Sequence, residues 1–297
     1  MAGRIKGIDL MKIIMALVVV IIHTTLWPLG GLTRVAVPFF FIVSGYFLFG
    51  KLETKETDEK AVLRQWIFRI LKMYLIWTAI YLPFTVYGFI LDSLSVKECL
   101  LVFVRNLFFV GQNYMSWPLW YLLAMIWGGI ILYILRAFKV PVWGFLLAGL
   151  LVYAVPKFLG DNPLFAKVFR NAENPAFVGP LYLAIGGALR SWRVRLPWWG
   201  AALLCVAAYV ALQFTEYAIP FMAVGLFLLA AGWKASFLSD RQALALRNGS
   251  EAIYLVHMIF AGLLMILAGM DKGPLLFGIT TVASSLAAWA YYKWIKC

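Results

Sequence analysis

The chain has 297 residues, of which 64% are apolar or aromatic and only 13% are charged. A soluble domain carries about a quarter charged residues, so this composition excludes an ordinary soluble protein and indicates surroundings that are mostly lipid. The net charge of +13 is therefore interpreted as a signal of membrane orientation, and no nucleic-acid partner is expected.

Ten apolar segments follow one another along the chain, and a helix of about 20 residues is needed to cross roughly 30 Å of hydrocarbon. We expect transmembrane helices near residues 8–28, 34–50, 68–90, 117–135, 140–156, 176–189, 197–215, 218–233, 250–269 and 274–292. The segment 96–110 is also apolar, but its three charged residues predict a short re-entrant or interfacial helix. The predicted fold is all-α, a polytopic membrane protein in which residues 1–297 form one domain.

The basic residues indicate how these helices are oriented. With ten crossings and both termini cytoplasmic, 19 of the 26 Lys and Arg residues lie on the cytoplasmic side. If the segment 96–110 also crossed, every later loop would change sides and this bias would largely disappear. The sequence therefore predicts a multi-pass protein of the inner (plasma) membrane, in contact with the lipid bilayer.

Lys12 and His23 are the polar residues that stand out in the first predicted helix. Ten residues separate them, which places both on one helix face, roughly 16 Å apart along the axis. A neutral imidazole is a suitable general base for a hydroxyl, and a cation at the cytoplasmic edge would suit the phosphates of a cofactor. The alternative is a snorkelling lysine and a histidine that only bonds a neighbouring helix.

Other polar residues in or beside the predicted spans have both structural and functional interpretations. Ser44 suits close helix packing, and Arg34 either binds an anion or snorkels. Arg69 and Lys72 flank the cytoplasmic entry to the third span, where such residues often serve orientation alone. His257 is expected on the cytoplasmic half of the ninth span, with a structural hydrogen bond. The two histidines lie on distant spans without nearby carboxylates, so no metal site is expected.

Several short motifs, in order along the chain, resemble those of the acyltransferase family 3 membrane proteins. They are Gly7-Ile8-Asp9-Leu10-Met11-Lys12 followed ten residues later by His23, Arg34 through Gly45, Arg69 with Lys72, Trp120-Tyr121-Leu122, Arg170-Asn171, and Asn248 through His257. The usual pattern in the first helix is an arginine, ten residues and a histidine. Here the basic residue is Lys12, which departs from that pattern. Lysine keeps the positive charge of arginine but cannot bind a phosphate in a bidentate manner.

The resemblance implies an acyl-CoA-dependent O-acyltransferase. Such an enzyme moves an acetyl group from cytoplasmic acetyl-CoA to a hydroxyl of an extracytoplasmic glycan, such as an envelope polysaccharide, or of another acceptor. It implies that His23 is catalytic and that Lys12, Arg69 and Lys72 bind the acyl-CoA. The residues implied in substrate binding are Arg34, Ser44, Arg170 and Asn171. Assembly into a homodimer is possible. The sequence identifies no carboxylate that would orient His23.

The membrane domain of the vancomycin-resistance serine racemases is similar to the same family. The alternative function is therefore a non-catalytic module that binds or transports an amino acid such as serine, and the lysine at position 12 favours this alternative slightly. The chain ends soon after the last predicted span, so no racemase domain is expected. A secondary transporter with repeated halves is less favoured, because neither repeats nor broken helices are evident in the sequence.

Overall fold

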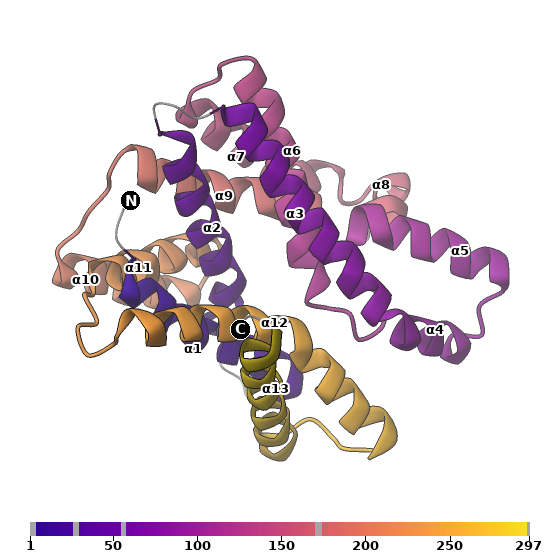
Figure 1. Cartoon of the computed structure of the whole chain (residues 1–297). Coiled ribbons are helices and arrows are strands. Elements are labelled where there is room, and N and C mark those ends of the chain that lie inside the picture. The colour runs from indigo at the N-terminus through magenta and orange to yellow at the C-terminus, as the bar shows by residue number, and fades with distance from the viewer. Residues whose placement is uncertain (1–3, 26–29, 55–57, 170–173, 296–297) are drawn as a thin grey trace. The chain divides into compact units, whose positions relative to one another are not determined.

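The computed structural model describes residues 4–25, 30–54, 58–169 and 174–295, and their regular structure is entirely helical (Figure 1). The chain divides into two compact units. Unit 1 comprises Met1–Val43 and Val194–Cys297, and unit 2 comprises Ser44–Arg193.

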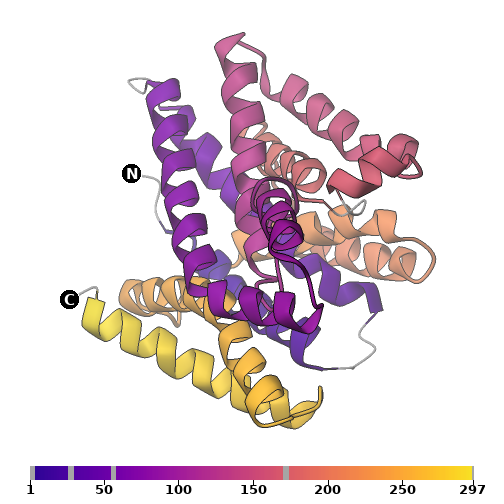
Figure 2. The ribbon, with the colours of Figure 1, turned by 90° about the vertical axis from the view of Figure 1, so that its right-hand side faces the viewer.

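Unit 1 is organised around three long helices. These are α1 (Lys6–Thr24), α12 (Asp240–Leu267) and α13 (Pro274–Ile295), and α12 packs closely against both of the others. The shorter helices η1 (Gly30–Val35), α10 (Trp198–Leu212), η3 (Glu216–Ala218) and α11 (Ile219–Gly232) complete the unit, together with the first half of α2 (Ala36–Leu52). Figure 2 shows α13 turning back alongside α12.

The helices α1 and α12 run in the same direction. At the start of α1, Lys6 donates a hydrogen bond to the carbonyl of Leu238 and pairs with Asp240, the first residue of α12. Near the end of α1, the ring of His23 lies against that of His257. If both helices cross the membrane, an odd number of crossings must separate them. The ten-span interpretation places seven there, and a further crossing by residues 96–110 would make eight.

Unit 2 contains the second half of α2 and the rest of the chain up to residue 193. Its helices are α3 (Glu59–Ile80), α4 (Leu82–Leu91), α5 (Val96–Arg105), η2 (Asn106–Val110), α6 (Leu119–Ala137), α7 (Val142–Leu159), α8 (Pro163–Phe169) and α9 (Pro175–Ser191). The central helix is α9, in which 13 of 17 residues are buried against its neighbours. Small residues permit this packing, since a Cβ on Gly45 or Gly179 would lie 2.2–2.3 Å from a carbonyl oxygen of the facing helix.

Each of the ten predicted segments contains a helix, but not all of these helices are long. Within the described part of the chain, six are long and apolar enough to cross a membrane, and a seventh span arises if α3 and α4 are counted as one helix bent by 51°. The bend lies at Tyr81, and Pro83 follows in the first turn of α4. Because α9, α10 and α11 are shorter, the number of crossings and the side of each terminus stay predictions.

One boundary differs clearly from the sequence-based expectation, and one predicted segment keeps its bounds. The ninth segment begins at residue 240 instead of 250, because Ser239 and Gln242 form a capping box that starts α12 ten residues earlier. The segment 96–110 forms α5 and a π-helical turn, η2. The ten residues of α5 extend for about 15 Å and none of them is buried, so this helix is too short to cross.

Candidate functional site

Lys12 and His23 both face α12, which confirms that they share one face of α1. The Nζ of Lys12 lies 3.2 Å from Oε1 of Glu251. The imidazole of His23 stacks on that of His257, with ring centroids 5.4 Å apart and an interplanar angle of 23°. The first helix therefore carries an ion pair in its first half and a pair of histidines near its end.

The expectation that the two histidines lie far apart is wrong. A span that begins near residue 250 puts His257 on its cytoplasmic half. The capped start of α12 at Asp240 puts His257 seventeen residues along the helix, level with the last turn of α1. The parallel packing of α1 and α12 then brings the two rings together.

The ring of His257 is fully buried and held in one orientation. Its Nδ1 lies 3.1 Å from the carbonyl oxygen of Ile253 and 2.9 Å from that of Tyr254. Because carbonyl oxygens only accept hydrogen bonds, Nδ1 carries the proton and donates it. In the neutral ring, Nε2 is then an acceptor, and it is buried with no hydrogen-bond partner among the described residues.

Lys12 is engaged by a carboxylate that the sequence did not identify. Its side chain is 11% exposed, whereas that of Glu251 is 55% exposed. Arg247 reaches the same carboxylate at 3.8 Å, one helical turn away. Asp9 is buried one turn before Lys12 and pairs with Arg4 at 3.4 Å. The start of α1 is therefore bound to α12 by charges that largely compensate one another.

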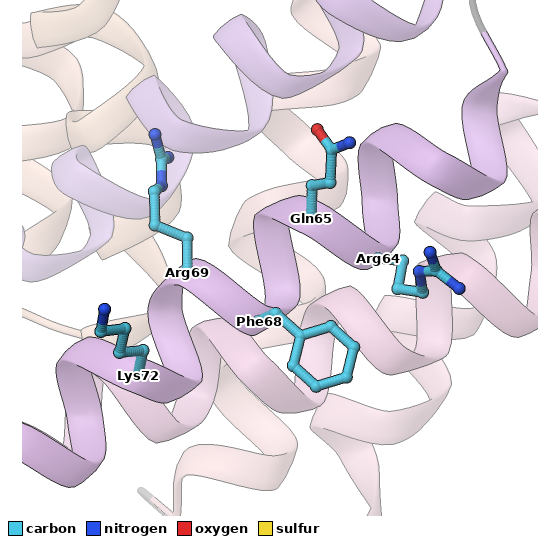
Figure 3. Close-up of a pocket in the computed structure, with 5 residues that line it drawn as sticks. All are labelled: Arg64, Gln65, Phe68, Arg69 and Lys72. Atoms are coloured by element: carbon cyan, nitrogen blue, oxygen red, sulfur yellow. The ribbon is translucent and has the colours of Figure 1, made fainter.

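Arg69 and Lys72 lie on α3 in unit 2. They line a shallow depression of about 710 Å³ together with Arg64, Gln65 and Phe68 (Figure 3). In Figure 3, Gln65, Arg69 and Lys72 extend from one side of the helix, as their spacing requires. The depression is open and is lined by one helix alone, and the two neighbouring cations Arg69 and Lys72 suit a ligand that carries phosphates.

The described residues implied in substrate binding belong to different units, Arg34 to unit 1 and Ser44 to unit 2. Ser44 is paired with the hydroxyl of Tyr121 at 3.1 Å, which fits the helix-packing interpretation. Arg34 forms an ion pair with Glu216 on the surface of unit 1. Arg170 and Asn171 lie outside the described residues. Within the described part of the chain, no group of three His, Cys, Asp or Glu side chains is arranged to hold a metal ion.

Comparison with a family model and with curated proteins shows which family this chain belongs to. A family model described as an acyltransferase domain matches residues 5–293. The chain is also 32% identical over 217 residues to a serine/alanine racemase of Enterococcus gallinarum, covering 62% of this chain and 29% of that protein. An amino-acid racemase of Enterococcus faecalis is 32% identical over 148 residues, covering 46% of this chain and 20% of that protein.

The chain thus spans less than a third of the length of these curated relatives. No solved structure matches it. The match to the family model covers all the described helices except the last residues of α13, and the apolar helices make the protein a multi-pass membrane protein. This chain belongs to the acyltransferase family 3 of membrane proteins.

Proposed function

We propose that this protein is a membrane O-acyltransferase that moves an acetyl group from acetyl-CoA to a hydroxyl of an extracytoplasmic glycan or another envelope acceptor. The observation that carries the proposal is the position of His23, held beside a second, fully buried histidine in a chain of the acyltransferase family. An imidazole in that position is suited to acid–base chemistry inside a membrane protein.

In this reaction His23 acts as general base. The imidazole takes the proton of the acceptor hydroxyl while the oxygen attacks the thioester carbonyl of the donor. The C–O bond forms, the C–S bond breaks, and the CoA thiolate leaves and is protonated by the imidazolium. A route in which His23 first carries the acyl group has the same overall balance, and the acceptor oxygen then attacks the acyl-imidazole.

We assign the phosphates of the donor to Arg69 and Lys72, because both line the depression on α3 and both are exposed. Lys12 joins them only if its pair with Glu251 opens, since its Nζ is already neutralised. Arg34, Ser44, Arg170 and Asn171 remain proposals for binding the acceptor. Of these, Arg34 would have to exchange Glu216 for the substrate.

The test is turnover of radiolabelled acetyl-CoA by the protein in lipid nanodiscs, measured as hydrolysis or transfer. His23→Ala is expected to bind acetyl-CoA and to lose about 10²–10⁴-fold in turnover. Thr24→Val is the matched control, because Thr24 is buried next to His23 and its hydroxyl bonds only its own helix. Wild-type turnover by His23→Ala would remove His23 from the mechanism.

The second candidate function is non-catalytic: the protein binds or transports an amino acid and transfers no acyl group. Two observations favour it: the racemase names of the relatives, and the pairing of Lys12 with Glu251. An ammonium and a carboxylate side by side offer opposite charges to a zwitterion. If the wild-type protein fails to bind acetyl-CoA but binds radiolabelled serine, and Lys12→Met abolishes this binding, the second function replaces the first.

The proposed location is the inner (plasma) membrane, with both termini in the cytoplasm. Reporter fusions at residues 139 and 271 test this orientation, since the ten-span interpretation puts the first in the cytoplasm and the second outside. Both reporters on the same side would contradict it.

A further inference from the structure

His257 has no role in the mechanism described so far, although it is one of the best-fixed side chains in unit 1. It is fully buried, its Nδ1 is bonded to two carbonyls of its own helix, and its ring lies against that of His23. The carbonyl bonds fix the plane of the His257 ring. A stacked neighbour then restricts the plane of the His23 ring.

The Nε2 atom of His257, and several hydroxyls on α13, lack hydrogen-bond partners among the described residues. This Nε2 is a buried acceptor, and the hydroxyls of Thr280, Thr281 and Ser284 on α13 are buried as well. Thr280 and Ser284 lie one turn apart on the buried face of α13, and both are fully buried. Unpaired polar groups in such surroundings cost free energy, so each requires a partner.

In the antiparallel pair of α12 and α13, the spacing from the connection puts Ser284 at about the level of His257, and Thr280 and Thr281 about one turn nearer the connection. His257 lies ten residues before the end of α12, and Ser284 lies ten residues after the start of α13. The chemistry is complementary, because Nε2 only accepts hydrogen bonds and hydroxyls donate them. An internal water, or a small rotation of one hydroxyl, would connect this acceptor with donors that have no partner among the described residues.

We propose that His257 is a positioning residue for His23, fixed at Nδ1 by the backbone of α12 and at Nε2 by the hydroxyls of α13, directly or through internal water. The inference rests on the proposed function, in which His23 is the base. By restricting the His23 ring plane, His257 keeps the reactive nitrogen aimed at the acceptor hydroxyl. Such orientation has large effects on rate, since a misplacement of about 1 Å costs on the order of 10²-fold.

Two substitutions separate the ring of His257 from its backbone bond. In His257→Asn the amide nitrogen can still donate at the position of Nδ1, but the stacking face is lost. In His257→Phe the face is kept and the donor is lost. We expect His257→Asn to lower kcat by about 10–100-fold with an unchanged KM for acetyl-CoA. His257→Phe keeps the face but loses both bonds that hold the ring, so we expect it to lower kcat only several-fold, as for loss of a hydroxyl on α13.

A purely structural role for His257 gives the opposite order. The Asn variant would then keep wild-type kcat, while the Phe variant would lose thermal stability because two carbonyls lose their donor. That result would overturn the proposal. Met258→Leu serves as a packing control, because Met258 is the next residue and is also fully buried.

Histidine-selective ¹⁵N labelling gives a readout that does not depend on activity, because the chain contains only two histidines. Solid-state NMR of the protein in lipid bilayers should show one imidazole as the Nδ1–H tautomer, and this signal should vanish in His257→Asn. The remaining His23 signals should shift in the same variant. If His257 is found as the Nε2–H tautomer, or if the His23 signals do not move, the proposal fails.

The hydroxyl contact is tested on α13, where the chain offers neighbouring serines. Ser284 is fully buried and Ser285 is exposed, so Ser285→Ala is the matched control for Ser284→Ala. We expect Ser284→Ala alone to lower kcat several-fold and to shift the His257 signals. Unchanged signals would remove the hydroxyls from the proposal. If the wild-type protein shows no turnover, the proposed function fails, while NMR still decides whether His257 orients His23.

Discussion

The pair between Lys12 and Glu251 offers the most informative substitution in the chain, because it separates two roles for Lys12. Glu251→Gln removes the negative charge and keeps the size of the side chain. Lys12 is only 11% exposed, so it cannot reach water easily once its partner is neutral. The protein therefore either loses stability or releases Lys12 for another anion.

The size of the effect follows from the geometry. Two unit charges 3.2 Å apart attract by about 5 kcal/mol at an effective dielectric constant of 20. Glu251 is 55% exposed, so solvent screening reduces this value to about 1–2 kcal/mol. For a protein of this size such a loss corresponds to roughly 2–4 °C in Tm.

The assay combines Tm in nanodiscs with the KM for acetyl-CoA. If Lys12 only fixes α1 to α12, Glu251→Gln lowers Tm by a few degrees and leaves KM unchanged. If Lys12 binds donor phosphates, removing its competitor lowers KM, and Lys12→Met raises it. The double variant completes a thermodynamic cycle, and its coupling energy should be about 1–2 kcal/mol. A coupling energy near zero would refute the reasoning that the two groups interact.

Three further predictions concern other parts of the chain. Arg69→Ala should weaken the binding of CoA by about tenfold and reduce its dependence on salt, as measured by equilibrium binding. Gly45→Ala should lower the free energy of unfolding by about 2 kcal/mol or more, because its Cβ would meet a carbonyl oxygen at 2.2 Å. Gly278→Ala is the control and should have little effect, because the space around Gly278 is open. Thermal unfolding compares the two variants. The pKa of Glu98 is lowered by hydrogen bonds from the side chain and backbone of Ser95, so the start of α5 should lose amide protection in hydrogen exchange as the pH falls through that lowered pKa. Ser95→Ala should weaken this dependence, because it removes the hydroxyl and keeps the backbone donor.

Much of this protein follows from local sequence patterns. Apolar segments of sufficient length predicted a helix at each of ten positions, and the structure has one at each. Helical periodicity predicted that Lys12 and His23 share a face, and they do. The three charges in the segment 96–110 predicted that it would not cross, and α5 is too short to do so. These properties depend on residues close together in the sequence.

The partners of the candidate site residues were not predictable in the same way. Glu251 and His257 are separated from Lys12 and His23 by more than two hundred residues, and nothing local pairs them. The capping box of Ser239 and Gln242 is visible in the sequence, and it predicts the early start of α12 and hence the correct level of His257 in that helix. Pairing it with His23 would still have required the packing of α1 against α12.

The amino-acid sequence by itself determined that this is a helical membrane protein and which residues of the first helix face inward, because hydrophobicity and periodicity are local. Only the tertiary structure decided that the inward face of α1 meets a carboxylate and a second histidine on α12. Helix packing depends on the fit of small residues such as Gly7, whose Cβ would lie 2.2 Å from a carbonyl oxygen of α11. That fit joins segments from opposite ends of the chain.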